Sequence, residues 1–274
     1  MLDLSTGLVL ACGFGATLLL AFVTWLCSLP LRDVSIVDRV WSVLITAAAL
    51  VYLVLAQPLP PSPSRAQLAF VLLLVWALRL TWHITQRNWG KPEDQRYQDI
   101  RKRNQPYFEF KSLYLVFALQ AGLAWLVAMP LFATGFSTTP LFWLDYAGMA
   151  LAIFGIVFEA VADWQLSQFG RNKTSKDQVM DTGLWSLSRH PNYFGEVCTW
   201  WGLYLLALAG GGWWSVVSPA FMTFTLLKVS GVNLLEKGIA ERRPKYKDYV
   251  ERVNAFIPGP QRQPRSGASQ NGKP

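Results

Sequence analysis

Seven long apolar stretches constrain the fold of this chain more than any other feature. A helix needs about 20 apolar residues to cross the hydrocarbon core of a bilayer, and somewhat fewer where a bundle shelters polar residues. The stretches that meet this requirement are Leu8–Cys27, Val40–Ala56, Leu68–Trp82, Leu113–Phe132, Leu141–Val161, Phe194–Gly210 and Trp213–Val229. The sequence therefore predicts an all-α membrane protein with seven transmembrane helices embedded in a lipid bilayer.

Composition excludes the main alternatives. Charged residues make up 15% of the 274 residues and hydrophobic residues 52%, whereas a soluble domain carries about 25% charged residues. The chain also has 13 Trp, 16 Phe and 9 Tyr, and Trp and Tyr favour membrane interfaces. A soluble enzyme and a disordered chain are both excluded. Cys12, Cys27 and Cys198 lie in apolar runs without a CxxC or Cys/His cluster, so we expect neither a disulfide framework nor a metal site.

One domain is predicted over residues 1–260. The first apolar segment lacks both a basic start and a cleavage site, so we interpret it as a retained helix and not a signal peptide. Residues 261–274 are polar and rich in Gly, Pro and Ser, a composition typical of disorder. No internal repeat is evident, which disfavours a transporter built from inverted repeats, although a protein that only binds its ligand remains an open alternative.

The basic residues predict the orientation. The net charge is +8, but nearly all Lys and Arg residues fall in every second loop and in the tail from Lys237. The remaining loops, 57–67, 133–140 and 211–212, contain only Arg65. Because Lys and Arg are retained on the cytoplasmic side, this pattern predicts an outside N-terminus and a cytoplasmic C-terminus. The positive charge therefore reports topology, and we expect no nucleic-acid partner.

Polar residues also line two of the predicted helices. Ionisable groups inside a membrane are costly and indicate a functional site by default. The stripe on the third helix comprises Trp76, Arg79, His83, Gln86 and Arg87, and that on the fifth comprises Gly155, Glu159, Asp163 and Ser167. Each set shares one helical face. Either the two stripes converge on a polar ligand, or they pair with each other and extend their charges to the headgroups.

The string from Asp181 to Glu196 carries the strongest local signal. Gly183 permits a turn, and Pro191 suits the first turn of the sixth helix. Arg189 and His190 offer donors beside that helix N-terminus, where a phosphate of a nucleotide cofactor could bind. An ordinary capped membrane helix with a basic flank is the alternative.

Four strings together resemble the bacterial DUF1295 branch of the steroid 5-alpha-reductase family. They are Thr182–Trp185, Ser188–Glu196, Ser35–Trp41 and Glu93–Tyr97, and the resemblance extends from about Ser35 to Pro258. It implies a seven-helix enzyme of the bacterial inner membrane that reduces the C=C bond of an enone with NADPH, bound in a cavity facing the cytoplasm.

The resemblance also implies site residues. Those implied for NADPH are Asp163, Arg171, Arg189, His190, Asn192, Tyr193, Glu196, Lys228, Asn233 and Glu236. Those implied at the substrate end are Asp38, Trp76, Arg79 and Tyr97. The steroid-reducing branch has a Gln–Glu pair near Asp38 and a Tyr at the position of Trp76. Since Trp cannot donate a proton as Tyr does, we expect a small hydrophobic enone of lipid or steroid-like type, without assigning a steroid.

The implied mechanism transfers hydride to the β-carbon of an activated alkene, after which a polar donor stabilises and protonates the enolate. Asp38 could be that donor only if an apolar surrounding keeps it protonated. Arg79, His83 and Tyr97 are alternative donors, and Tyr97 could instead cover the cofactor.

Membrane methyltransferases of the isoprenylcysteine and phospholipid type share part of this pattern, and such a protein would bind S-adenosylmethionine. Their Arg-His-Pro string and the acid after the last helix match Arg189–Pro191 and Glu236. The features that favour the reductase are Trp185, the continuation Asn192–Glu196, and the strings that contain Asp38 and Glu93–Tyr97.

Overall fold

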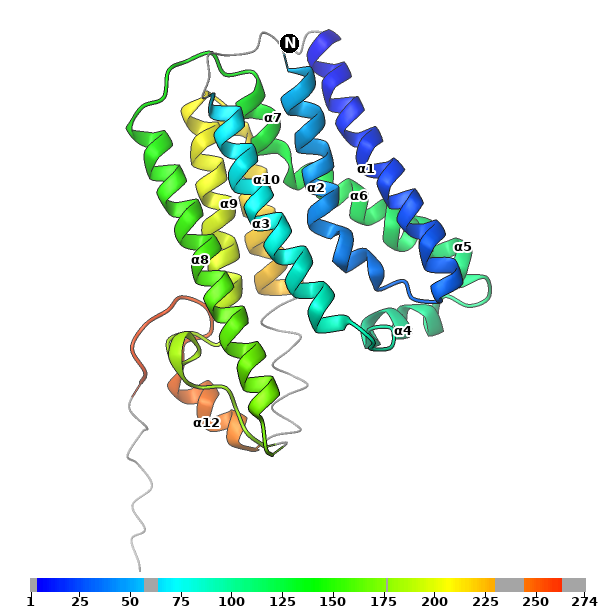
Figure 1. Cartoon of the computed structure of the whole chain (residues 1–274), viewed down its shortest axis with the longest axis vertical. Helices are drawn as coiled ribbons and strands as arrows, with labels where there is room; N and C mark the ends of the chain where they lie inside the picture. Colours follow the sequence, from blue (N-terminus) through cyan, green and yellow to red (C-terminus); the bar gives the residue numbers. More distant parts are fainter. Residues whose placement is uncertain (1–3, 57–63, 176, 230–243, 263–274) are drawn as a thin grey trace, which may run out of the picture. The chain divides into compact units, whose positions relative to one another are not determined.

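A computed structural model describes residues 4–56, 64–175, 177–229 and 244–262. Over these ranges the chain is helical without any β-strand (Figure 1), which confirms the predicted all-α class. Five helices are long and apolar enough to cross a membrane: Thr6–Leu31, Ile36–Leu55, Arg65–Asn88, Phe108–Val127 and Trp143–Asn172. They correspond to the first five predicted stretches, and they make the chain an integral membrane protein.

The chain divides into two compact units, each described here by itself. The first unit comprises Met1–Phe154 and Cys198–Met222, and the second comprises Gly155–Val197 and Thr223–Pro274. Helices α8 (Trp143–Asn172) and α9 (Pro191–Ala209) therefore contribute residues to both units.

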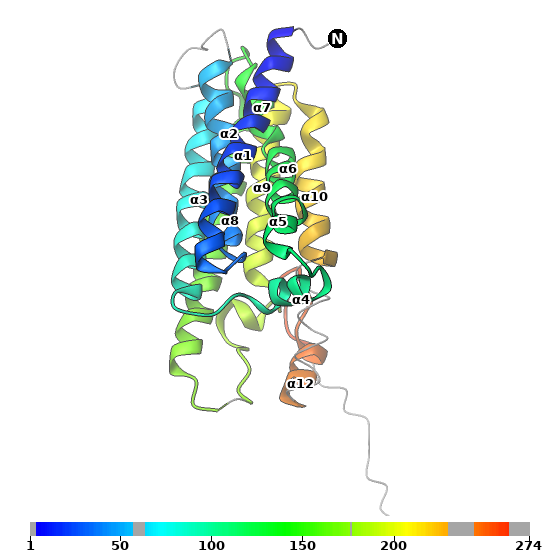
Figure 2. The ribbon, with the colours of Figure 1, turned by 90° about the vertical axis from the view of Figure 1, so that its right-hand side faces the viewer.

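Three long helices stand side by side in the first unit (Figures 1 and 2). Helix α2 (Ile36–Leu55) packs against both α1 (Leu4–Leu31) and α3 (Arg65–Asn88). Helix α6 (Leu119–Val127) contacts α1 and α2, and α7 (Met129–Gly135) contacts α2 and α3. The short helices α4 (Gln95–Arg103) and α5 (Phe108–Ser112) lie at the end of this unit far from the N-terminus.

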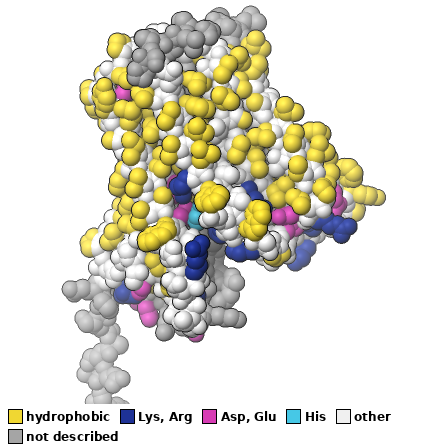
Figure 3. All heavy atoms as spheres, viewed as in Figure 1, with side chains coloured by type: hydrophobic (Ala, Val, Ile, Leu, Met, Phe, Trp, Pro, Cys, Tyr) yellow, Lys and Arg dark blue, Asp and Glu magenta, His cyan; other side chains and the backbone are white. Residues whose placement is uncertain are grey.

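Hydrophobic side chains point outward as well as inward in this unit. Small residues such as Ala48, Ala69 and Ala121 are fully buried, so neighbouring helices approach closely. Large residues such as Leu19 and Leu78 are exposed. Figure 3 shows hydrophobic side chains over this face of the long helices and charged side chains gathered around α4 and α5. This distribution is expected where lipid replaces water around the helices.

The fourth predicted span has different bounds in the structure. It begins at Phe108 and runs through a π-helical segment, Leu113–Ala118, to the end of α6 at Val127. The prediction that it continues to Phe132 is wrong, because Pro130 has no N–H with which to continue the helix. The chain turns at Ala128 and starts again as α7.

The last two predicted stretches are not among the five candidate spans of the described residues. Helix α9 starts at Pro191 because proline suits the first helical turn. The seventh stretch forms three short elements in succession: a 3-10 turn Trp213–Val216, α10 (Val217–Phe224) and a π-helical turn Thr225–Val229.

Arg65 is the only Lys or Arg in the loops that the sequence places outside, and its side chain is buried. Its Nε and Nη2 donate to Asp145 Oδ1 and Oδ2 at 2.6 and 2.8 Å, and the two side chains are 1% and 0% exposed. Arg65 Nη1 also donates to Thr139 Oγ1 at 3.0 Å and to Ser137 Oγ. The ion pair joins the first turn of α3, where Ser64 forms a capping box, to the first turn of α8.

Within the first unit, α8 and α9 touch through glycine. A Cβ atom on Gly202 would lie 2.5 Å from the backbone N of Ala152 and 2.7 Å from the carbonyl O of Gly148. No side chain can move aside there, because both obstacles are backbone atoms. The two helices are packed backbone to backbone at this point.

We therefore expect Gly202→Ala to lower the free energy of unfolding by about 1–3 kcal/mol, because the added methyl must push the helices apart. Gly122→Ala is the matched control, since nothing lies within 4 Å of its added Cβ. That substitution should stabilise α6 by about 0.5–1 kcal/mol through the lower backbone entropy of alanine. Unfolding of both variants in mixed micelles measures the difference, and equal effects would contradict the packing argument.

Candidate functional site

A carboxylate and a phenol meet in the first unit. Tyr97 Oη on α4 donates to Asp38 Oδ1 on α2 at 2.6 Å, and Arg96 Nη2 donates to Asp38 Oδ2 at 2.9 Å. Tyr97 is buried, whereas Arg96 is about half exposed. Asp94 caps the N-terminus of α4 by accepting from the Arg96 N–H at 2.9 Å. Two strings that lie far apart in the sequence thus form one polar cluster.

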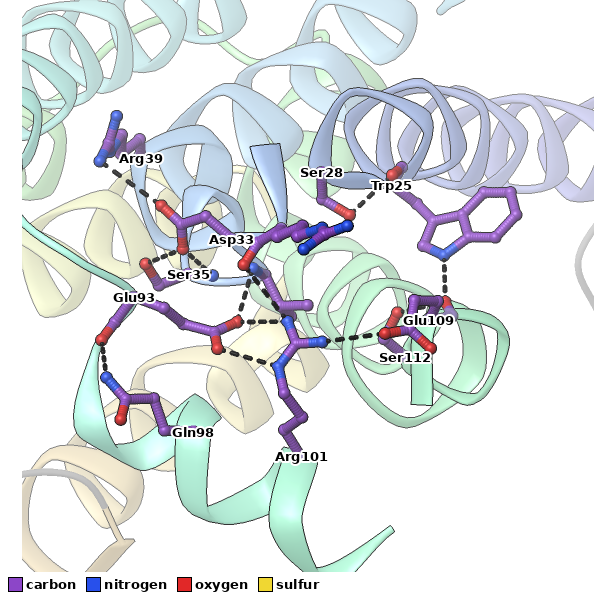
Figure 4. Close-up of polar contacts among 12 residues, drawn as sticks. Trp25, Ser28, Asp33, Ser35, Arg39, Glu93, Gln98, Arg101, Glu109 and Ser112 are labelled. Carbon is purple, nitrogen blue, oxygen red and sulfur yellow. Dashed lines mark hydrogen bonds and ion pairs between the residues drawn. The ribbon is translucent and has the colours of Figure 1, made fainter. Parts of the chain in front are cut away.

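A second charged cluster holds α4 in place (Figure 4). Arg101 donates two hydrogen bonds to the Glu93 carboxylate, from Nε to Oε2 at 3.0 Å and from Nη2 to Oε1 at 2.9 Å. Its Nη1 reaches Glu109 Oε1 at 3.3 Å. Glu93 Oε1 in turn accepts from the backbone N–H of Val34 in the turn between α1 and α2 at 2.9 Å. This bidentate pair fixes the helix that carries Tyr97.

Sequence analysis did not single out Arg96 or Arg101. Arg96 stands inside the quoted string Glu93–Tyr97, so the string carried a signal for it. Arg101 lies outside every quoted string and could have been found only as a helical neighbour of Tyr97 on α4, four residues further along.

Burial, followed by the negative charge of Asp38, raises the pKa of the Tyr97 phenol well above its ordinary value of 10.0. A phenol with a raised pKa stays protonated at physiological pH and remains a hydrogen-bond donor. Asp38 and Tyr97 therefore form a coupled pair that can hold a proton and donate a hydrogen bond to an oxygen atom.

Trp76, predicted at the substrate end, packs against a residue that the sequence did not indicate. It is fully buried on α3 and meets Trp200 of α9 edge to face, with ring centroids 5.2 Å apart and an interplanar angle of 82°. Arg79 follows one turn later on α3 and is partly buried. Trp200 lies within an apolar run, where one more aromatic residue carries no distinct signal.

A groove of ≈ 400 Å³ lies between α2 and α3. Near it, the Ser42 and Thr81 hydroxyls are 2.7 Å apart, and Ser42 stands one helical turn after Asp38. The groove is mostly apolar, with a few hydroxyls, and its shape suits an alkyl chain. Its lining residues are Val43, Thr46, Leu74, Ala77, Leu78, Thr81, Trp82 and Thr85.

In the second unit, two of the residues predicted for the cofactor meet directly. Asn192 Nδ2 on α9 donates to Asp163 Oδ1 on α8 at 3.1 Å, and Asp163 is 4% exposed. Glu196 is also buried and follows Asn192 by one turn on the same face of α9. The helices approach closely here, since a Cβ on Gly195 would lie 2.6 Å from the backbone N of Glu159. These side chains form a polar wall between two tightly packed helices.

The predicted turn at Gly183 is present and is anchored to α8. Gly183 has φ of 60°, which favours glycine, and starts the 3-10 turn Gly183–Ser186. The Leu184 N–H donates to Gln165 Oε1 at 3.0 Å, and Trp185 Nε1 donates to the Ala162 carbonyl at 3.0 Å. This part of the string therefore positions the backbone beside Asp163.

Arg189 also makes structural contacts. Its Nη1 donates to the carbonyls of Val250 and Val253 at 2.9 and 2.8 Å, at the end of helix α12 (Pro244–Arg252). His190 is buried, and its ring stacks on Tyr193 with centroids 5.6 Å apart and planes 4° apart. A guanidinium bound to helix-terminal carbonyls stabilises α12.

The remaining predicted cofactor residues differ in what can be described. Arg171 is exposed in the last turn of α8, and Lys228 is exposed in the π-helical turn. Asn233 and Glu236 lie outside the described residues. Within the described ranges, no group of three or more His, Cys, Asp or Glu side chains could hold a metal ion.

Because the pKa of Tyr97 is raised, we expect its phenol to stay protonated at about pH 11, where an ordinary tyrosine is largely ionised. Alkaline difference absorbance of the wild type and of Tyr97→Phe should therefore agree up to that pH. The stability that this raised pKa contributes is complete below about pH 10 and declines at higher pH. Asp38→Asn should move the Tyr97 titration to lower pH, because it removes a negative charge. Loss of one ionising phenol near pH 10 in Tyr97→Phe would contradict this interpretation.

Comparison with known proteins identifies the family. The sequence model of the family described as "Protein of unknown function (DUF1295)" matches residues 24–253. Similarity also extends to an uncharacterized protein, C594.04c, of Schizosaccharomyces pombe (strain 972 / ATCC 24843), which is 25% identical over 284 residues. That alignment covers 89% of this chain and 79% of the relative. No solved structure matches the chain. The family match includes both the Asp38–Tyr97 pair and the Asp163–Asn192 pair, and the chain belongs to the DUF1295 family within the steroid 5-alpha-reductase grouping.

Proposed function

We propose that this membrane protein uses NADPH to reduce the activated C=C bond of a lipid or steroid-like enone. The observation that carries the proposal is the 2.6 Å hydrogen bond from the buried Tyr97 phenol to Asp38. Enone reduction needs a donor that can stabilise an enolate oxygen and a source for the proton that follows. Family membership and the apolar helical bundle support the same reaction class and a hydrophobic substrate.

Tyr97 and Asp38 would act on the substrate oxygen and the proton. Bound NADPH would supply a hydride to the β-carbon of the substrate and would thereby become NADP⁺. Tyr97 has one O–H, which it would turn from Asp38 to the carbonyl oxygen as negative charge develops there, and a proton from water would then bond to the α-carbon. Arg96 holds the Asp38 carboxylate at 2.9 Å, so the pair keeps its geometry while the proton moves. The net reaction consumes one hydride and one proton and converts the C=C bond into a CH–CH bond.

The second unit offers the groups that NADPH requires. The Asp163–Asn192 pair and Glu196 supply buried acceptors and a donor that suit ribose hydroxyls or the nicotinamide carboxamide. Arg171 and Lys228 supply exposed cations that suit phosphates. A carboxylate repels phosphate, so Glu196 is assigned to the uncharged part of the cofactor.

The class of cofactor can be tested by thermal shift. Titration of the purified protein with NADPH should stabilise it with the logarithm of ligand concentration, by about 2.7 kcal/mol at a hundredfold excess over the dissociation constant. Tyr97→Phe should retain this shift but lose enone-dependent oxidation of NADPH. A shift with S-adenosylmethionine and none with NADPH would replace the reductase by a methyltransferase.

Variants measured in the same experiment test which residue binds which part of the cofactor. Arg171→Ala should weaken NADPH more than NADH if its guanidinium binds the additional phosphate, and Glu196→Ala should weaken both. Lys102→Ala serves as the control because it removes an exposed cation of α4, in the first unit. Equal weakening of NADPH by Arg171→Ala and Lys102→Ala would indicate general electrostatics instead of a phosphate contact.

We also propose that the N-terminus faces outward and that α4 lies on the cytoplasmic side, in the inner membrane of a bacterium. The support is that Arg65, which stood as the one basic residue in the predicted outer loops, is neutralised in a buried ion pair with Asp145. The predicted outer loops, as far as they are described, therefore present no unpaired Lys or Arg to the outer surface.

Cysteine labelling tests this orientation. Thr138, between α7 and α8, is exposed, so a cysteine there should react with an impermeant maleimide on intact cells. A cysteine at Lys102 on α4 should react only after the membrane is made permeable. Both belong in a background without Cys12, Cys27 and Cys198. The reverse pattern of labelling would refute the proposed topology.

A further inference from the structure

The groove between α2 and α3 opens onto the lipid-facing side of the first unit. Two of its lining residues on α3, Leu78 and Trp82, are 64% and 66% exposed, and Val43 on α2 is 39% exposed. Around helices that cross a membrane, the medium that meets such a groove is the acyl region of the bilayer. A hydrophobic chain is therefore the occupant that this medium offers.

Two of the three threonine hydroxyls that line the groove are already used within the chain. Thr46 Oγ1 donates to the Ser42 carbonyl at 2.8 Å, and the Thr81 and Ser42 hydroxyls share a hydrogen bond of 2.7 Å. Most of the remaining wall is aliphatic, with Leu74 and Ala77 among its residues. The groove therefore offers contact to methylene groups and few hydrogen bonds, which suits an acyl chain.

The length of the groove matches one leaflet. Its lining residues on α3 run from Leu74 to Thr85, which at 1.5 Å per residue is about 16 Å along the helix. The hydrocarbon core of a bilayer is about 30 Å thick, so each leaflet contributes about 15 Å. These residues lie in the half of α3 that ends at Asn88 and leads to α4. One acyl chain of the leaflet on that side would fill the groove from end to end.

Two guanidinium groups contact Asn88 just beyond that end of the groove. Arg39 stands one turn before Val43 on the same face of α2, and its Nη2 donates to the Asn88 carbonyl at 3.3 Å. Arg87 Nε donates to Asn88 Oδ1 at 3.3 Å. Thr85, the last lining residue on α3, precedes Asn88 by about one turn. Positive charge thus follows directly on the apolar groove.

The Arg39 guanidinium is loosely paired among the described residues. Its ion pair with Asp33 measures 3.9 Å from Nη2 to Oδ2, and its buried Nε has no hydrogen-bond partner there. Arg65 and Arg101, in contrast, each donate two hydrogen bonds to one carboxylate. Because the Arg39 side chain is 24% exposed, an anion outside the chain can approach its terminal N–H groups.

We propose that the groove binds one acyl chain of an anionic phospholipid, to whose phosphate Arg39 and Arg87 donate hydrogen bonds. The apolar wall accounts for the chain, the length for a lipid of one leaflet, and the two guanidinium groups for the phosphate. Trp82 lines the groove near this end and suits the level where a chain meets its headgroup, since Trp favours the interface. A choline headgroup would bring its own cation close to the two arginines, so an anionic headgroup is favoured.

Native mass spectrometry of the full chain tests this lipid site without NADPH or an enone. The delipidated protein in detergent micelles is titrated with phosphatidylglycerol and, separately, with phosphatidylcholine that carries the same acyl chains. The first bound phosphatidylglycerol should be held at least about fivefold more tightly, the factor expected for one cation at an anionic lipid surface. Equal affinities for the two lipids would overturn the proposal and leave an uncharged hydrophobic tail as the occupant of the groove.

Substitution of the arginine tests the contact with the headgroup. Arg39→Gln should weaken phosphatidylglycerol binding about fivefold and leave phosphatidylcholine binding nearly unchanged, whereas Arg39→Lys should keep part of the preference because it keeps the charge. Arg103→Gln is the matched control, since Arg103 is another exposed arginine and lies on α4. If Arg39→Gln and Arg103→Gln weaken phosphatidylglycerol equally, the preference reflects general surface charge and the proposal fails.

Filling the groove tests the contact with the chain. Val43→Phe should weaken the binding of both lipids, because the added ring occupies the space of the acyl chain. Val54→Phe is its control, since Val54 is exposed on the same face of α2, about three turns further along, and does not line the groove. Leu78→Phe repeats the test from α3 if Val43→Phe lowers the melting temperature without lipid. Unchanged lipid binding in a folded groove variant would refute the inference.

Discussion

Buried charge in an apolar helical bundle must be paired, and the first unit is organised around such pairing. Arg65 and Asp145 neutralise each other where α3 and α8 begin. Removing either partner would leave a buried charge alone, which typically costs about 3–5 kcal/mol. Where α4 meets the turn before α2, Glu93 and Arg101 provide the second pairing. The first pair joins the starts of α3 and α8, and Glu93 of the second also accepts from the Val34 N–H in the turn before α2.

This arrangement gives the candidate chemistry its rigidity. Tyr97 lies on a helix of only nine residues, Gln95–Arg103, and a helix that short is marginal by itself. The Glu93–Arg101 pair and the Asp94 cap hold it, so the phenol stays directed at Asp38. Side chains of the second unit also stabilise the backbone around a candidate site. Arg189 and Trp185 donate hydrogen bonds to backbone carbonyls in the same unit as the Asp163–Asn192 pair. A residue predicted to bind the cofactor, such as Arg189, can therefore have a structural role in the site.

The first unit also separates two kinds of polar group. The Asp38 cluster is charged and partly accessible, whereas the Trp76–Trp200 pair is neutral and fully buried. Neutral donors can remain in an apolar core at far lower cost than ions can.

Hydropathy alone determined the helical class and the first five membrane spans, because a run of about 20 apolar residues has few other stable arrangements. Residue types, not hydropathy, placed the turn at Gly183 and the start of α9 at Pro191, because glycine permits the turn and proline suits a first helical turn. Apolar content could not show that Pro130 divides the fourth stretch, since proline counts as apolar while it removes a backbone donor.

Only the tertiary structure decided which polar side chains interact with each other. The sequence placed Arg65 in a loop, but only packing brings it to Asp145, and it placed Asp38 and Tyr97 in separate strings that only the docking of α4 joins. Trp200 carried no signal, because the importance of an indole depends on whether its N–H meets an acceptor. Such pairings join residues distant in the chain, whereas composition and periodicity report only on neighbours.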